Sequence, residues 1–279
     1  PIPKIENIRP HMKRIEIGAD LNGHELAQVT RVLTTTSEVN RFIDDLVEGE
    51  LEFVRLYDWA KQLTHLPELT RRLRIAIDED GRVTDDASDA LRQIRSQIRR
   101  SEQSIRETLD GLIRGNQARY LSDAIVTMRN ERYVIPVKHE YRSMFGGVVH
   151  DQSASGQTLF IEPKQIVELN NRLRQHQIAE KNEITRILSE LSAALVPARK
   201  EIIHNAFVIG KFDFMNAKAR FAKAIKGVVP SINAQNYVVF KQARHPLIAM
   251  EKVVANDIVI GKDYQAIVIT GPNTGGKTI

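Results

Sequence analysis

The 279-residue sequence contains no cysteine and one tryptophan, and aromatic residues make up only 6% of it. Without cysteine the chain can form neither disulfide bonds nor thiolate metal sites, which fits a cytoplasmic protein. It has no apolar run that approaches the roughly 18 residues of a membrane span, so no membrane partner is expected. The eight histidines are scattered and show no metal-ligand spacing. These absences exclude a disulfide scaffold and predict no histidine or cysteine metal centre.

The charge balance favours a polyanionic partner only mildly. Lysine and arginine number 40 against 35 acidic residues, giving a formal net charge of +5. A solvated basic surface explains a charge of this size equally well. Hydrophobic residues at 42% and charged residues at 27% are ordinary for a globular protein with a sizeable core.

The clearest motif lies at the C-terminal end of the sequence. Residues 271–278 fit the phosphate-binding pattern G-x-x-x-x-G-K-[ST]. In such loops glycine-rich backbone N–H groups cradle phosphates, so Lys277 is predicted to reach the β- and γ-phosphates and Thr278 to contact Mg²⁺. The apolar, β-branched run 266–270 predicts a buried parallel strand that feeds the loop. The predicted phosphate-binding residues are Gly271, Pro272, Asn273, Thr274, Gly275, Gly276, Lys277 and Thr278.

Thr278 is the only predicted metal contact, through Mg²⁺. A helix should follow such a loop, and none follows in this sequence. We therefore expect a nucleotide site that is present in outline but does not hydrolyse nucleotide by itself. The sequence is interpreted as a piece of a longer protein.

The rest of the chain is predicted to be mainly α with a small β insertion. Apolar residues at helical spacing indicate a helical first part over 1–85 and a second helical part over 198–230. Long amphipathic helices are predicted within 86–118 and 164–197, with a β-rich insertion over 119–163 between them. Strand-like runs replace helical patterns over 231–279, with a domain boundary near 228–232.

The two long helices are predicted to pair antiparallel as lever arms with the β insertion at their tip. The first helix carries a heptad seam, with apolar or small residues at alternating spacings of four and three. Its members are Ala87, Leu91, Ile94, Ile98, Ser101, Ile105, Thr108 and Leu112. In the insertion, strands are predicted within 125–128, 133–137, 147–150 and 157–161.

Three blocks near the C-terminal end occur in a recognisable order. Arg244-His245-Pro246 comes first, Asn256-Asp257 follows a short apolar stretch, and the phosphate-binding loop comes last. This set resembles the start of the ATPase domain of the MutS family. The loop residue Thr274 and the insertion residues 149–158 look like the second bacterial paralogue of that family.

The resemblance implies a fold and a function. Residues 1–85 and 198–230 would form the MutS-like helical core, the long helices the levers, the β insertion the clamp, and 231–279 the truncated start of an α/β ATPase domain of the ABC type. The whole protein would be a homodimer that uses ATP and Mg²⁺ to clamp branched or mismatched DNA. It would suppress homologous recombination, with endonuclease activity in a C-terminal domain beyond this chain.

Two alternatives stay open at this point. The same architecture would serve an ATP-driven sensor that binds rRNA and splits collided ribosomes. A protein of another class, a non-catalytic coiled-coil scaffold arm, would share the long helices but not the compact β tip.

The resemblance also suggests residues on the adenine side of the nucleotide. These are His245, Val253 and Asn256, although a structural hydrogen bond explains His245 slightly better. Mismatch-repair members place an aromatic side chain where this sequence has Val253, so adenine would meet an apolar wall without stacking. Phe160-Ile161-Glu162 spells the Phe-x-Glu motif of those members, but its place in the insertion predicts core packing with a solvated glutamate.

Basic side chains form two candidate nucleic-acid surfaces, because phosphate contacts need little more than positive charge. One is a stripe on the first lever helix and the other a cluster with tyrosines in the insertion. A solvated face, partly neutralised by neighbouring glutamates, is the alternative for both. The stripe is Arg92, Arg95, Arg99 and Arg106, and the main cluster residues are Arg129, Arg132, Lys138 and Arg142.

Overall fold

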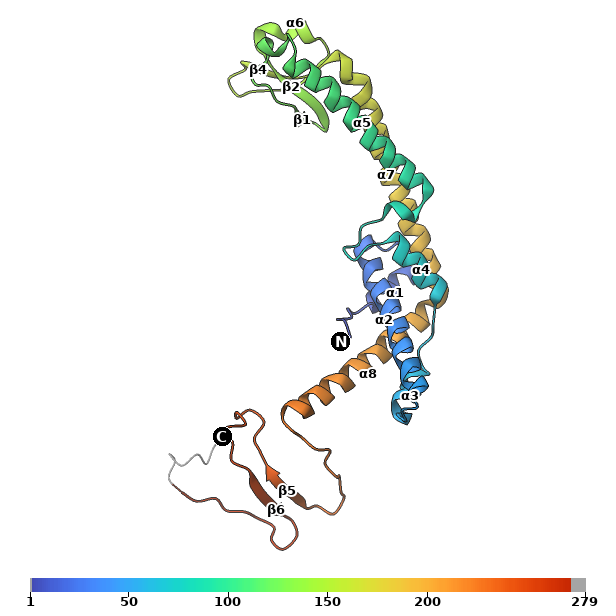
Figure 1. Ribbon diagram of the computed structural model, residues 1–279, viewed down its shortest axis with the longest axis vertical. Helices are drawn as coiled ribbons and strands as arrows, with labels where there is room; N and C mark the ends of the chain where they lie inside the picture. The colour runs from blue at the N-terminus through green and yellow to red at the C-terminus, as the bar shows by residue number, and fades with distance from the viewer. Residues whose placement is uncertain (1, 272–279) are drawn as a thin grey trace. The chain divides into compact units, whose positions relative to one another are not determined.

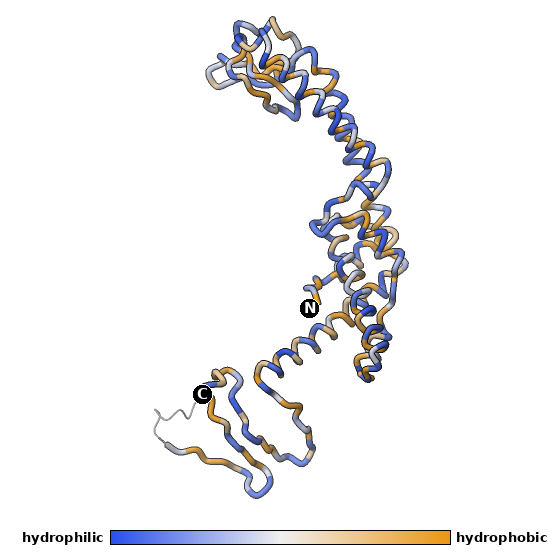
Figure 2. Tube along the Cα trace, in the orientation of Figure 1, coloured by the Kyte–Doolittle hydropathy of each residue, from blue (hydrophilic) through white to orange (hydrophobic). Residues whose placement is uncertain are grey.

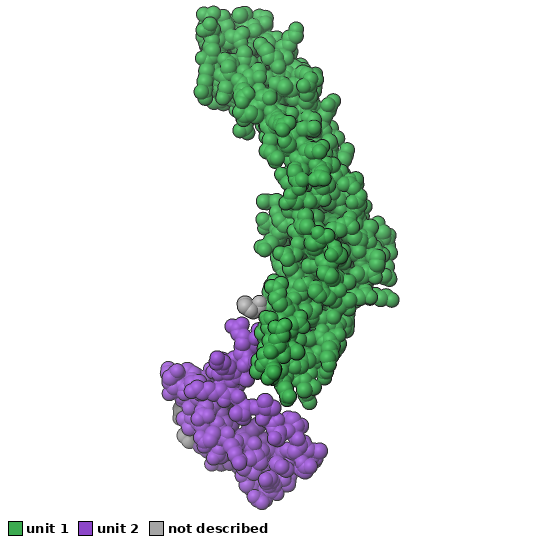
Figure 3. Space-filling view, turned by 45° about the vertical axis from the view of Figure 1, so that its right-hand side comes forward, with its two compact units in different colours: residues 1–210 green, residues 211–279 purple. Residues whose placement is uncertain are grey.

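The computed structural model describes residues 2–271. It separates into two compact units, Pro1–Gly210 and Lys211–Ile279 (Figure 3). As predicted, the chain is mainly helical with small antiparallel sheets. The boundary between the units falls inside helix α8 (Arg199–Ala224), earlier than the predicted 228–232. Beyond Phe212 none of the helix's side chains is buried.

The first unit begins with a helical core. Its opening helices are α1 (Arg9–Glu16), α2 (Gly23–Glu48), α3 (Val54–Ala60) and α4 (Pro67–Ala76). Helix α2 starts at a capping box, in which the side chain of Asn22 accepts from the Glu25 amide and the Glu25 carboxylate accepts from the Asn22 amide, each at 2.9 Å. The buried cluster of this core includes Met12, Leu26, Leu33, Leu73, Leu191 and Ile202.

Two long helices leave this core side by side. Helix α5 (Asp89–Arg114) and helix α7 (Lys164–Leu195) pack along each other, and both run up to the β strands of the unit (Figure 1). Contacts between the start of α5 and the later part of α7 show that they run antiparallel: Arg95 bonds Glu180 at 2.7 Å and Ser88 bonds Glu183 at 2.7 Å. The predicted antiparallel pair is therefore present.

The seam of α5 departs from the predicted heptad pattern near its end. Leu91 and Ile105 are buried as predicted, but Leu109 and Ile113 then replace Thr108 and Leu112 as the buried positions. A straight α-helix has 3.6 residues per turn and drifts by about 20° per heptad, so a strict seven-residue repeat moves off the contact line. The end of α5 packs under the β strands, which favours the shifted face.

Two hydrophobic clusters share this helix pair. One belongs to the helical core and contains Leu91, Ile187 and Leu191; the other contains Ile105, Leu109, Ile166 and Leu173. Between Leu91 and Ile105 on α5, and between Leu173 and Ile187 on α7, no side chain is fully buried. The middle of the pair is therefore held by half-buried side chains and polar contacts.

The β insertion is a four-stranded antiparallel sheet of order β1-β2-β4-β3. Its strands lie where the β-branched runs indicate: β1 (Thr127–Arg129), β2 (Arg132–Lys138), β3 (Val148–Gln152) and β4 (Thr158–Glu162). Short helical turns complete it: η2 (Ala118–Tyr120), η3 (His139–Tyr141) and α6 (Arg142–Phe145). Along the strands and the long helices, hydrophobic residues alternate with hydrophilic ones (Figure 2). We call residues 118–162 the β module.

Among its described residues, the second unit contains one antiparallel strand pair, β5 (Val238–Ala243) and β6 (Asn256–Ile260). The strand predicted over 266–270 is not formed, and Val268 and Ile269 are 83% and 72% exposed. A buried parallel strand needs neighbouring strands to satisfy its backbone hydrogen-bonding groups. Among the described residues, neither β5 nor β6 pairs with residues 266–270. The parallel-strand prediction is therefore wrong for this structure.

Ser88 holds the start of the lever pair in two ways. Its hydroxyl accepts from the Leu91 amide at 3.0 Å as the N-cap of α5 and donates to Glu183 on α7. We expect Ser88→Ala to lower the free energy of unfolding by about 1 kcal/mol, measured by urea denaturation. Ser104→Ala, at an exposed position inside α5, should change it by less than about 0.5 kcal/mol. Equal effects of the two substitutions would contradict the capping role.

Glu183 should make stability depend on pH in the acid range. Hydrogen bonds from Arg186 and Ser88 lower the pKa of Glu183 from 4.5 to about 2. Because the folded pKa is the lower one, this contribution is complete above pH 4.5 and is lost as the pH falls toward 2. We expect Glu183→Gln to flatten the dependence of the unfolding free energy on pH in this window. An unchanged slope in the variant would refute the assignment.

Candidate nucleic-acid and nucleotide sites

The predicted arginine stripe on α5 lies largely in intramolecular ion pairs. Arg92 bonds Asp86 and Asp89, each at 2.8 Å. Arg95 is 22% exposed and bonds Asp85 and Glu180 at 2.7 Å and the Val83 carbonyl at 2.9 Å.

Arg99 lies 3.5 Å from Asp85, so Asp85 stands between two arginines. The hydrogen bond from Arg95 is the main cause that lowers the pKa of Asp85. The acidic turn before α5 therefore neutralises the lower part of the stripe. Arg106, farther along the helix, is exposed and has no ion pair with the described residues.

The basic residues of the β module divide into fixed and exposed ones. Arg129 is stacked over the Phe160 ring, with its guanidinium carbon 4.3 Å from the ring centre, and bonds Asp151 at 3.0 Å. Its side chain is 38% exposed. Arg132 is 25% exposed and bonds Glu162 at 3.1 Å and Asn171 at 2.7 Å. Both side chains are thus held in one orientation, and Arg132 is turned toward helix α7.

A second group of basic side chains gathers around two tyrosines whose rings contact each other at a tilt. Tyr120 and Tyr141 have ring centres 4.8 Å apart, and the Arg119 guanidinium lies 4.8 Å from the Tyr120 ring. Lys138 donates to the Arg119 carbonyl at 3.0 Å. The sequence analysis missed Arg119, although a basic residue next to Tyr120 in a β-rich segment was a readable signal.

Arg142 is exposed on the same module and forms no ion pair with the described residues. It lines a shallow hollow of about 330 Å³ together with Glu140, Ser143, Gly146, Gly147, Val149 and Ile161. With Arg119 it offers a positive charge to solvent. These two arginines are exposed basic side chains of the β module that have no carboxylate partner among the described residues.

Glu162 differs from its predicted environment. The carboxylate was expected to be solvated, yet the residue is only 2% exposed, so that prediction is wrong. His150 and Arg132 both bond it, at 2.6 and 3.1 Å. The strand end turns directly into α7 at this point, which buries the side chain between sheet and helix.

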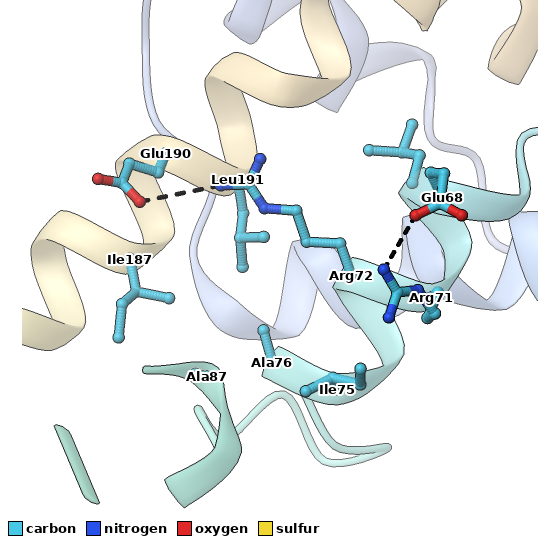
Figure 4. A pocket seen from close by; sticks show the side chains of 10 residues that line it. Glu68, Arg71, Arg72, Ile75, Ala76, Ala87, Ile187, Glu190 and Leu191 are labelled. Carbon is cyan, nitrogen blue, oxygen red and sulfur yellow. Dashed lines mark hydrogen bonds and ion pairs between the residues drawn. The ribbon is translucent and has the colours of Figure 1, made fainter. Parts of the chain in front are cut away.

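A larger hollow of about 410 Å³ lies between α4 and α7 (Figure 4). Ala76, Ile187 and Leu191 contribute its apolar lining. Arg71 pairs with Glu68 at 3.0 Å, and Arg72 lies 3.8 Å from Glu190. Since the charges compensate one another, the hollow has no concentrated charge for an anionic ligand.

The residues predicted beside the nucleotide base lie in the second unit. Asn256 opens β6 opposite Ala243, so it lies at the same end of the strand pair as His245. The His245 ring accepts from the Leu247 amide at 3.3 Å, as expected of a structural hydrogen bond. Val253 is half-buried, and its amide bonds the Ala249 carbonyl at 3.0 Å.

Only Gly271 of the phosphate-binding loop belongs to the described residues. Its φ of +148° is a conformation that side-chain-bearing residues rarely adopt, in keeping with a glycine at this position. The other predicted contacts, Pro272, Asn273, Thr274, Gly275, Gly276, Lys277 and Thr278, lie outside the described residues. Within residues 2–271 no group of three metal-ligating side chains comes together, and no helix is long and apolar enough to cross a membrane.

Comparison with known proteins connects these features. No family model matches the chain. The whole chain is 75% identical to Endonuclease MutS2 of Enterococcus faecalis, 61% identical to that of Latilactobacillus sakei and 57% identical to that of Levilactobacillus brevis. It covers 35–36% of the length of these relatives.

Identity of this size along all 279 residues places the chain among MutS-type proteins. Within that class the chain is similar along its whole length to proteins named MutS2. The resemblance read from the sequence is confirmed at this level.

Because Arg95 has ion-pair partners and Arg106 has none among the described residues, replacing each by glutamine should affect the free energy of unfolding differently. Arg95→Gln removes a largely buried cation from two carboxylates and a carbonyl, so we expect the free energy of unfolding to fall by about 1–2 kcal/mol. Arg106→Gln, on an exposed face of the same helix, should change it by less than about 0.5 kcal/mol. Urea denaturation of both variants checks this, and equal stability of the two would contradict the ion-pair assignment.

Proposed function

We propose that this chain is the core, lever and clamp part of an ATP-dependent MutS2 protein that grips branched or mismatched DNA. Similarity along the whole chain to proteins named MutS2 and the complete phosphate-binding motif at 271–278 support this proposal. The whole protein would act as a homodimer and suppress homologous recombination. The endonuclease activity that its relatives' names state would reside in chain beyond these residues.

The observation that carries the proposal is the β module with its uncompensated basic side chains. Arg119 and Arg142 are exposed and have no carboxylate partner among the described residues. Arg129 is partly exposed but pairs with Asp151, and Lys138 lies beside Tyr120 and Tyr141. Side chains of this kind contact phosphates without reading sequence, which suits a protein that recognises the shape of DNA. The lever arginines Arg92, Arg95 and Arg99 are weaker candidates, because carboxylates already pair with them.

ATP and Mg²⁺ are the cofactors that this proposal includes. Lys277 would contact the β- and γ-phosphates and Thr278 the Mg²⁺ ion, while the glycines allow close approach of the backbone. His245, Val253 and Asn256 would lie toward the adenine. Bound ATP would supply the free energy that opens and closes the dimer. Within the described part of the loop, the positive φ of Gly271 fits such a cradle.

The direct test is binding of this chain to labelled nucleic acids at several salt concentrations. Four-way-junction DNA, linear duplex DNA and ribosomal RNA would be compared by fluorescence anisotropy. We expect junction DNA to bind most tightly, with an affinity that falls as salt rises because bound phosphates release counterions. Arg119→Ala combined with Arg142→Ala should weaken binding about tenfold and reduce the salt slope by roughly two.

A matched control is Arg41→Ala, which removes an exposed arginine from the helical core. It should leave affinity and slope unchanged. Tighter binding of ribosomal RNA than of any DNA would favour the ribosome-splitting alternative. Absence of binding to every nucleic acid at low salt would refute the proposal and favour the scaffold alternative.

A further inference from the structure

One buried carboxylate joins the sheet of the β module to helix α7. Glu162, the last residue of β4, is 2% exposed. Its two oxygens accept hydrogen bonds from three different elements: Arg132 on β2 at 3.1 Å, His150 on β3 at 2.6 Å and Asn170 on α7 at 2.9 Å. A buried carboxylate is tolerated only when such donors surround it, so this cluster is a demanding feature of the fold.

The amides of α7 extend this cluster to the backbone of the sheet. Asn170 is 2% exposed; its amide donates to the Tyr133 carbonyl at 3.1 Å, and its oxygen faces the Tyr133 amide at 3.4 Å. Asn171 accepts from Arg132 at 2.7 Å. Strand β2 is therefore bonded to α7 through the side chain of Arg132 and the main chain of Tyr133.

The backbone around Glu162 is equally constrained. Gly147 adopts a φ of +84°, and a Cβ there would lie 2.0 Å from the Glu162 carbonyl oxygen. Val148 pairs with Glu162 across the β3–β4 ladder. Pro163 then occupies the N-cap position of α7. The position of the carboxylate is thus fixed from the sheet and the helix together.

We propose that Glu162 is a positioning residue for nucleic-acid binding and that Arg132 serves it rather than contacting phosphate. The Glu162 cluster, defined as Glu162, Arg132, His150, Asn170 and Asn171, holds the sheet on α7. It thereby keeps the exposed arginines of the β module in one fixed arrangement. This inference rests on the proposed function, and it reassigns Arg132 from the predicted nucleic-acid contacts.

The first measurement needs no nucleic acid. Hydrogen exchange of the full chain should show the Tyr133 amide and the first turns of α7 exchanging at least about tenfold faster in Glu162→Gln than in the unmodified chain. Amides of α2, in the helical core, should keep their rates. Glu168→Gln is the matched control, because that glutamate lies on the exposed face of α7 and pairs with Arg172 at 3.3 Å. Unchanged exchange in Glu162→Gln would overturn the proposal.

The second measurement separates positioning from contact. Arg132→Lys keeps the positive charge but cannot hold both Glu162 and Asn171 as the guanidinium does. If Arg132 is a positioning residue, the affinity for junction DNA falls about tenfold in Arg132→Lys while the salt slope stays the same. An affinity preserved in Arg132→Lys together with a slope reduced by about one in Arg132→Gln would show a direct phosphate contact and overturn the reassignment.

The two proposals fail in different ways. If the unmodified chain binds no nucleic acid, the proposed function fails, yet hydrogen exchange still tests the Glu162 cluster. If Glu162→Gln releases the whole β module, the double variant with Arg132→Gln should recover part of the lost protection, because no half-buried cation is then left without its carboxylate partner. Additive losses in the double variant would contradict a shared role of the two residues.

Discussion

The pairing of helices α5 and α7 is the constraint on which the first unit depends. Both helices contribute to the cluster of the helical core and to the cluster under the β module. Their middle part lacks fully buried side chains, so its alignment depends on polar contacts such as that of Arg95 with Glu180, next to the bond of Ser88 to Glu183 at the start of the pair. The apolar ends set the strength of the association, and the polar middle sets its register.

Partners decide what each arginine of this chain can do. An arginine between two carboxylates, such as Arg95, has its charge compensated and contributes to folding. Arg119 and Arg142 keep their charge available to solvent. Arg132 occupies a third position, because its partner Glu162 is buried and links three elements. The same side-chain type thus stabilises, binds or positions, according to the acids around it.

The sequence predicted the helical parts, the lever pair and the four strands of the β module because hydrophobic periodicity reports which faces are buried. It could not show that Asp85 and Glu180, far apart in the chain, both pair with Arg95 of the arginine stripe. Nor could it show that Glu162 is buried, since a glutamate at a strand end is usually exposed. The prediction of a strand at 266–270 was wrong, because a local preference for β structure does not supply the neighbouring strands that a sheet needs. The phosphate-binding loop stays a prediction, apart from the conformation of Gly271.

The central claim is that the β module is the part of this chain that binds nucleic acid. Hydrogen exchange with and without saturating four-way-junction DNA tests it most directly. The account predicts slower exchange on added DNA within residues 118–162 and unchanged exchange in α2. Protection confined to the helical core, or no protection anywhere along the described chain, would contradict it.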